Sequence, residues 1–356
     1  MYYPESSIIT TKDGLHCQIY MSDHPRGLVI VKPKYIPTDK ISSSALPLRY
    51  IHGRKLNRLN MWISKERLKK YLADFKRAYP DYVHFSKNHG TWFFAVPEKK
   101  IERVYDSRKG LQELMKMPAA SLDGHLRNVM EFVKFLKRSG VPLKDFGLTY
   151  STLVGHYFLG ISDINIVVYG KKNFWKVIGF LEKAKHPNLR FKTDKEWIEY
   201  HKKRGRTLVL NKKEFLFHSR RKKWEGFWNG NLFLILGVEK PNEVSVSWNK
   251  EKYKPLGIFK VHGKIKSDHH SGVRPGLYEI ENGKVLGKKD EIPLKYIVFF
   301  TRNFAMQAKK GENVEAQGLL ESSTDKDGKE YYRLVLGYFD SFLSGRNKKE
   351  YLKVLK

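Results

Sequence analysis

The chain of 356 residues has a single cysteine, Cys17. One cysteine excludes an intrachain disulfide and any zinc site built from several cysteines, and it fits a reducing compartment. No segment approaches the roughly 20 consecutive apolar residues of a membrane-spanning helix. The first residues also lack the basic start and apolar stretch of a secretion signal. The sequence therefore predicts a cytoplasmic protein with no membrane partner.

Several common active-site patterns are also missing. The chain has no P-loop, no glycine-rich dinucleotide fingerprint and no Gly-x-Ser-x-Gly nucleophile turn. P-loop nucleotide hydrolases, dinucleotide-dependent oxidoreductases and α/β-hydrolases depend on these patterns to hold phosphates or to expose a serine. These classes are therefore disfavoured.

Acidic residues are scarce compared with basic ones. The chain has 68 Lys and Arg against 37 Asp and Glu, a formal net charge of +31. Such an excess repels itself unless a polyanion neutralises it. A thermophile surface is the alternative explanation, but that enrichment raises Lys and Glu together. The charge therefore predicts a nucleic-acid partner, either DNA or RNA.

The length predicts two or three domains, and the apolar content is sufficient for a folded core. Short β-prone runs with one amphipathic helix form a first region; an α/β pattern follows, and alternating strands end the chain. We expect an α+β or α/β multi-domain protein. Its regions are an N-terminal β-rich unit (1–100), a core (101–240) and a β-rich domain (241–356).

The last region predicts a compact barrel. Its alternating runs are Val244–Trp248, Gly257–His262, Tyr296–Phe300, Val314–Leu320 and Tyr331–Leu336. Turn dipeptides at hairpin positions separate them, namely Asn282-Gly283, Lys310-Gly311 and Asp327-Gly328. An OB-like β-barrel is the expected fold, with another small β-sandwich as the alternative.

The most informative stretch runs from Phe146 to Gly170. It contains Tyr150-Ser151, a gap, and then Asp163-Ile-Asn165 at the start of an apolar run. This order resembles the signature of the DNA polymerase beta-like nucleotidyltransferase superfamily: a Gly-Ser turn followed by Asp-apolar-Asp on a strand. Residues two apart on a strand face the same side, so two such acids can share a metal ion. Taken alone, Ser162 to Asn165 also reads as an ordinary turn and strand entry.

The resemblance implies a role for each matching residue. Asp163 would hold Mg²⁺ with Asn165, and Tyr150 and Ser151 would lie at the nucleotide phosphates. Glu214, in a predicted strand Glu214–His218, is the candidate for a third acid. Tyrosine in place of the usual glycine obstructs the approach of a phosphate, and asparagine in place of the second acid removes a charge that attracts Mg²⁺. Both changes are expected to weaken catalysis.

The whole chain also resembles a group of archaeal predicted nucleotidyltransferases. In that group an N-terminal β-unit with a His-Pro step, here His24-Pro25, precedes the core and a β-rich tail. The resemblance is strict only between Phe146 and Gly170. It implies a nucleotidyltransferase-like core.

Two basic clusters flank the predicted strand Glu214–His218. Together they supply the candidate nucleic-acid contacts Lys202, Lys203, Arg204, Arg206, Arg220, Arg221, Lys222, Lys223 and Trp224. Basic side chains neutralise phosphates, and neighbouring aromatic rings stack on unpaired bases. A solvated charged face is the alternative for either cluster.

These observations lead to one main hypothesis and two alternatives. The main one is a nucleic-acid-binding protein on a nucleotidyltransferase-like fold whose catalysis is weakened or lost. An active Mg²⁺-dependent nucleotidyltransferase that extends a nucleic acid is the first alternative. The second is a structural factor associated with the ribosome or with replication, which implies protein partners in a nucleic-acid complex.

Overall fold

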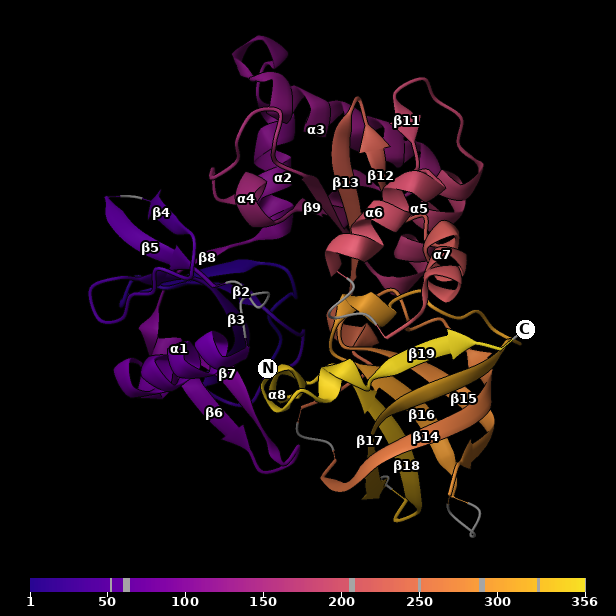
Figure 1. Ribbon diagram of the computed structural model, residues 1–356. Coiled ribbons are helices and arrows are strands. Elements are labelled where there is room, and N and C mark those ends of the chain that lie inside the picture. Colours follow the sequence, from indigo (N-terminus) through magenta and orange to yellow (C-terminus); the bar gives the residue numbers. More distant parts are fainter. Residues whose placement is uncertain are drawn as a thin grey trace.

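Three β-sheets, each with its own hydrophobic core, make up the protein (Figure 1). The computed structural model describes residues 1–51, 53–59, 65–204, 209–248, 251–287, 292–324 and 327–355. The mixed α+β class predicted from the sequence is confirmed. The three sheets follow one another along the chain.

The N-terminal unit is an eight-stranded sheet covered by one long helix. Its strands run in the order β4-β5-β3-β2-β1-β8, with the β6–β7 hairpin joined to β3. The elements are β1 (Ile8–Thr11), β2 (His16–Ile19), β3 (Leu28–Pro37), β4 (Leu48–Ile51), β5 (Arg54–Arg58), α1 (Lys65–Ala78), β6 (Val83–Ser86), β7 (Thr91–Pro97) and β8 (Ile101–Tyr105). Helix α1 packs Leu68, Tyr71 and Phe75 on the sheet, at the helical spacing expected of a buried stripe.

The middle unit is a five-stranded mixed sheet in the order β11-β12-β13-β10-β9. Strand β10 runs parallel to β13 and antiparallel to β9. The elements are α2 (Ser107–Lys116), α3 (Gly124–Leu136), β9 (Phe146–Leu148), α4 (Tyr150–Leu153), β10 (Ile164–Tyr169), α5 (Lys171–Lys183), β11 (Leu189–Arg190), α6 (Asp194–Arg204), α7 (Lys212–Arg221), β12 (Glu225–Trp228) and β13 (Asn231–Val238). Helices α3 and α5 pack on one face, against Ile164, Ile166 and Val168.

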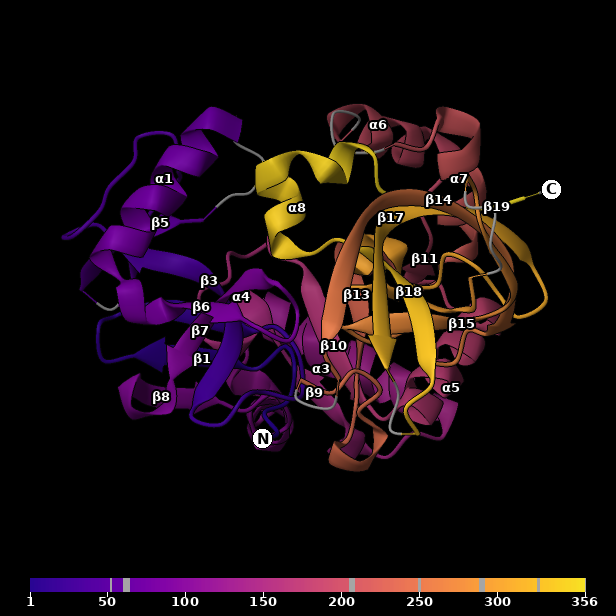
Figure 2. The ribbon, with the colours of Figure 1, turned by 90° about the horizontal axis from the view of Figure 1, so that it is seen from below.

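The C-terminal unit is a closed five-stranded barrel. Its strands pair in the order β14-β15-β16-β18-β17, and β17 pairs back to β14. Strand β16 runs parallel to β18, and the short β19 extends the sheet from β17. The elements are β14 (Tyr253–Ser267), β15 (Gly276–Val285), β16 (Leu294–Phe299), β17 (Asn313–Thr324), β18 (Glu330–Leu336), α8 (Phe339–Ser344) and β19 (Tyr351–Val354). Figure 2 shows the barrel beside the N-terminal unit, with α8 between them.

Three local predictions from the sequence were wrong. Residues Glu214–His218 lie in helix α7, where Asn211 and Glu214 form a capping box that fixes the first turn. The run Val244–Trp248 is not a strand, because Val246 and Trp248 pack between the N-terminal unit and the barrel. Asn282-Gly283 lies within β15 beside a register shift and does not form a hairpin turn.

The N-terminal unit and the barrel share a continuous apolar interface. Ile30 and Phe93 from the first unit meet Val298 and Phe300 from the barrel. Trp248 fills the space beside Phe93, with ring centres 4.9 Å apart. Buried contact of this kind holds two units in one arrangement. No helix in the described residues is both long and apolar enough to cross a membrane.

A buried ion pair on the face of the barrel that meets the N-terminal unit provides a test of stability. Arg333 Nε lies 2.8 Å from Glu321 Oε2, and both side chains are almost fully buried. Removing one partner of such a pair leaves the other charge buried without compensation. We expect Glu321→Gln to lower the free energy of unfolding by about 3–5 kcal/mol in urea denaturation.

An exposed pair in the same barrel is the control. Lys264 and Glu281 lie 3.3 Å apart at the surface. We expect Glu281→Gln to cost at most about 1 kcal/mol, because solvent screens exposed charges. Equal losses for the two variants would contradict this account of the buried pair.

Candidate functional site

Strand β10 and helix α4 bring the residues of the central motif together. Helix α4 begins at Tyr150 directly after β9, and Asp163 immediately precedes β10. The backbone of Tyr150 has φ 55°, in the left-handed region that glycine adopts more readily than other residues. The tyrosine thus takes a backbone conformation that glycine adopts with less strain.

The face of the sheet that carries Asn165 offers apolar neighbours. Asn165 pairs with Leu234 of the parallel strand β13, and directly paired residues lie on the same face. Leu232, two residues earlier on β13, lies on this face as well. A third acid taken from the neighbouring strand would occupy one of these positions, and both are leucine.

Basic side chains surround Asp163. Burial raises the pKa of its carboxyl group, while the charges of Lys192, Arg58 and Lys34 lower it. Burial together with the charge of Arg58 in turn lowers the pKa of Lys34 to about 7. Three cations from different parts of the fold thus act on one carboxylate.

The Lys192 side chain interacts with two acids, Glu225 and Asp163. Glu225 on β12 pairs with Leu234, which places Glu225 in the same row of the sheet as Asn165. The Lys192 ammonium forms a buried ion pair with Glu225, and its charge also acts on Asp163. The site therefore has a resident cation, fixed on a side chain, beside the carboxylates.

The N-terminal unit covers the turn that would hold a nucleotide. Gln18 Nε2 donates to the Tyr150 hydroxyl at 3.2 Å, and Lys34 Nζ lies 4.1 Å from the centre of the Tyr150 ring. Thr149 donates a hydrogen bond to the Ser6 carbonyl. The cavity left beside Tyr150 and Ser151 is about 10 Å³. That is room for about one water molecule beside these two residues.

The donor set also does not fit Mg²⁺. Mg²⁺ requires oxygen ligands in near-octahedral geometry and usually binds through one or two carboxylates. Here Asp163 stands with an amide, two leucines and three basic groups, and the carboxylate of Glu225 is already paired with Lys192. Among the described residues no group of three or more His, Cys, Asp or Glu could hold a metal ion.

Glu214 belongs to another part of the protein. It begins helix α7, where its carboxylate accepts a hydrogen bond from the backbone of Asn211 at 3.0 Å. The same side chain pairs with Lys353 of β19 at 3.2 Å. Glu214 thus caps a helix and ties it to the barrel.

The cluster from Arg220 to Trp224 is largely engaged within the fold. Arg220 Nε lies 2.7 Å from Asp194, and Arg221 pairs with Glu312 at 2.6 Å. Lys222 donates to the Asn303 carbonyl, and Lys223 Nζ lies over the Phe191 ring. Trp224 packs against the core of the middle unit. This cluster links α7 to its neighbours more than it faces solvent.

The other cluster is more open. Lys202 and Lys203 are exposed on helix α6, and neither has an acid within ion-pair distance in the part of the chain described. Arg204 ends the helix. Its side chain, and Arg206 altogether, lie outside the described residues.

Two further sets of basic residues lie outside these clusters. The first, here called the lysine rim, consists of Lys212, Lys213, Lys348 and Lys349. All four are exposed and, within the described ranges, lack an acidic partner. No local pattern in the sequence links the two lysine pairs, because positions 212 and 348 are far apart in the chain.

The second set, here called the basic hairpin, is the β4–β5 ribbon with Arg49, Arg54, Lys55 and Arg58. Tyr50 on this ribbon is 73% exposed. The basic stretch is visible in the sequence. The structure shows in addition that β4 and β5 pair as an antiparallel ribbon.

Comparisons with known proteins support an archaeal context. The chain is 28% identical over 335 residues to an uncharacterized protein of Methanocaldococcus jannaschii, covering 92% of this chain and 94% of that protein. No family model matches the chain. No solved structure matches it at a significant level.

The Lys192 ammonium predicts a specific response to metal ions. We expect Lys192→Met to lower the melting temperature, because Glu225 is then buried without a partner at a cost of about 3–5 kcal/mol. Millimolar Mn²⁺ should restore part of the loss in the variant and leave the wild type unchanged. Scanning calorimetry with and without Mn²⁺ measures both effects.

The control is Lys195→Met, which removes an exposed charge from the same segment. It should behave like the wild type. A wild type that Mn²⁺ stabilises, with the effect lost in Asp163→Asn, would mean that the acids bind metal despite Lys192.

Proposed function

We propose that this chain is a nucleic-acid-binding protein whose middle unit is a nucleotidyltransferase-like scaffold without catalysis. The observation that carries the proposal is the exposed, unpaired lysine rim. Four ammonium groups without acidic partners repel one another. A phosphate backbone would neutralise them and release its counterions.

The barrel supports the same proposal. Its first three strands are consecutive neighbours, the fifth strand lies between the third and the fourth, and the fourth closes on the first. We assign this arrangement to the OB type, which binds oligonucleotides through its strands and loops. The basic hairpin is a second surface for nucleic acid, because the exposed ring of Tyr50 lies among basic residues there.

The scaffold interpretation rests on the site around Asp163. Phosphoryl transfer of this type depends on metal ions that bridge the phosphates and neutralise developing charge. Leu232, Leu234 and Lys192 replace the acids and the metal that such a step requires. An active transferase is therefore not favoured. A structural factor in a larger nucleic-acid complex makes the same binding predictions.

The lysine rim yields a quantitative prediction. We expect the combined variant Lys212→Ala, Lys213→Ala, Lys348→Ala and Lys349→Ala to weaken binding to a single-stranded oligonucleotide. The slope of log affinity against log salt should become shallower by about 0.7 for each lost phosphate contact. Fluorescence anisotropy at several salt concentrations measures both quantities.

A second quadruple variant controls for total charge. It removes four exposed cations from the α3 side of the middle unit: Arg127, Lys134, Lys137 and Lys144. Its salt slope should stay near that of the wild type. If both variants lose affinity equally, binding follows net charge alone and the rim is not the contact surface.

Tyr50 tests the basic hairpin separately. Stacking of a base on an aromatic ring contributes about 1–3 kcal/mol. Tyr50→Ala should therefore weaken single-strand binding by that amount and leave the salt slope unchanged, because no phosphate contact is lost. Phe85→Ala removes another exposed ring, 43% exposed on β6, and should have little effect. Unchanged affinity in Tyr50→Ala would exclude the hairpin as a stacking surface.

A further inference from the structure

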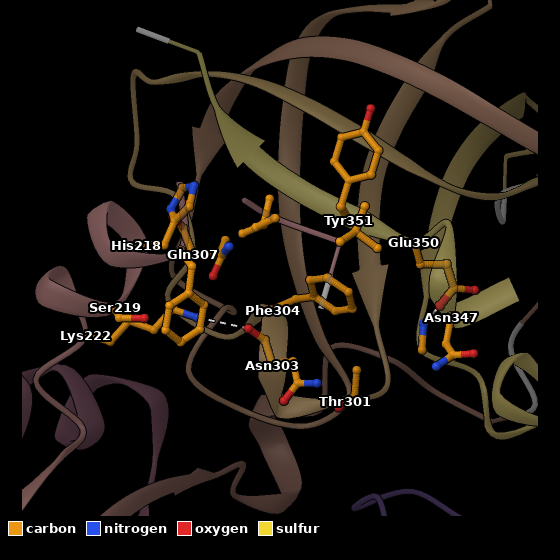
Figure 3. Close-up of a pocket in the computed structure, with 14 residues that line it drawn as sticks. His218, Ser219, Lys222, Thr301, Asn303, Phe304, Gln307, Asn347, Glu350 and Tyr351 are labelled. Carbon is orange, nitrogen blue, oxygen red and sulfur yellow. Dashed lines mark hydrogen bonds between the residues drawn. The ribbon is translucent and has the colours of Figure 1, made fainter. Parts of the chain in front are cut away.

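A cavity lies between helix α7 and the barrel, away from the Asp163 site. It is bounded by α7, by the segment that precedes it, by the turn after β16 and by the start of β19 (Figure 3). Its volume is about 80 Å³. That is several times the roughly 10–15 Å³ that one water molecule requires, so a small ring has room.

The walls of the cavity are apolar and aromatic. Phe215 from α7 and Phe304 from the barrel line it, together with Leu210. Phe215 is held in place by Tyr200, whose ring is stacked with it at 6.3 Å. Flat, rigid walls of this kind favour a flat ligand over a flexible one.

Several polar groups at the cavity lack partners. In the described part of the chain, the side chains of Thr301, Asn303 and Asn347 make no hydrogen bond. Lys222 Nζ donates only to the Asn303 carbonyl, at 2.9 Å, and no carboxylate of the described residues pairs with it. An ammonium group has three donors, so two remain for a ligand. Figure 3 shows Lys222, Asn303 and Thr301 along one side of the cavity.

Two other polar groups at the cavity are already satisfied. Gln307 Nε2 donates to the Leu352 carbonyl at 3.1 Å, and Glu350 accepts from the backbone of Gly337 at 2.8 Å. Burial lowers the pKa of Lys222 to about 7, and Arg221 contributes to the shift. The groups that remain for a ligand are therefore two amides, a hydroxyl and an amine that loses its charge readily. Such groups suit a ligand with a polar but uncharged edge.

We propose that this cavity binds one unstacked nucleobase of a nucleic-acid strand whose phosphates lie on the lysine rim. A base has apolar faces and an edge of donors and acceptors, and asparagine and lysine are among the side chains that read such edges. Lys213 precedes Phe215 by two residues, and Lys348 directly follows Asn347. These lysines would bind the phosphates on either side of the base. The inference rests on the proposed function, because it places one base of the bound polymer.

The test uses a single-stranded oligonucleotide with one 2-aminopurine, read by anisotropy for binding and by emission for unstacking. Binding to the wild type should change the emission of the central 2-aminopurine. Lys222→Met and Asn347→Leu should abolish the change in emission and weaken affinity about 5- to 150-fold. Asn347→Leu fills the cavity without altering charge, so it decides the question if Lys222→Met does not fold.

Lys137→Met is the matched charge control, because it removes one exposed lysine on the other side of the middle unit. It should keep the emission change.

Titration of free nucleoside monophosphates by calorimetry distinguishes the cavity proposal from the proposed function. Strand binding without a change in emission, and with no nucleotide binding, would overturn the cavity proposal alone. Nucleotide binding that Asn347→Leu abolishes, without strand binding, would support the cavity and overturn the proposed function.

Discussion

The buried carboxylate of Glu5 is the contact on which the arrangement of the three units depends. One of its oxygens pairs with Arg274 and the other lies 2.5 Å from Arg302, both from the barrel unit. Arg302 also donates to the Gly237 carbonyl at the end of β13. A single acid near the start of the chain thus joins the N-terminal unit, the middle sheet and the barrel. Burying three charges is costly unless their geometry is complementary, so this junction tolerates little rearrangement.

The scarcity of acids gains a structural meaning from such junctions. Glu5, Glu321 and Glu225 are all buried or nearly buried with basic partners. Acids used inside the fold do not neutralise the surface. The four lysines of the rim are exposed and, among the described residues, lack acidic partners. This distribution, more than the total of +31, favours a polyanionic partner.

The middle unit surrounds the turn at Tyr150 and the carboxylate of Asp163 with basic side chains. Tyr150 keeps a left-handed backbone and Asp163 keeps its place before β10. Lys34 and Gln18 from the N-terminal unit lie over the tyrosine, and Lys192 provides the cation.

The sequence by itself determined the strand Ile164–Tyr169, the helices on either side of it and the β-rich end of the chain, because hydrophobic periodicity is local. It also indicated the departures at Tyr150 and Asn165. It assigned Glu214 to a strand, since Phe215 and Phe217 alternate with other residues, whereas a capping box and packing on the barrel make it a helix. Only the tertiary structure decided that Leu234 stands beside Asn165, that Arg220 and Arg221 are paired, and that Lys222 lines a cavity. The physical reason is that strand pairing and ion pairs join residues that are distant in the chain, and no local pattern records which partner each will meet.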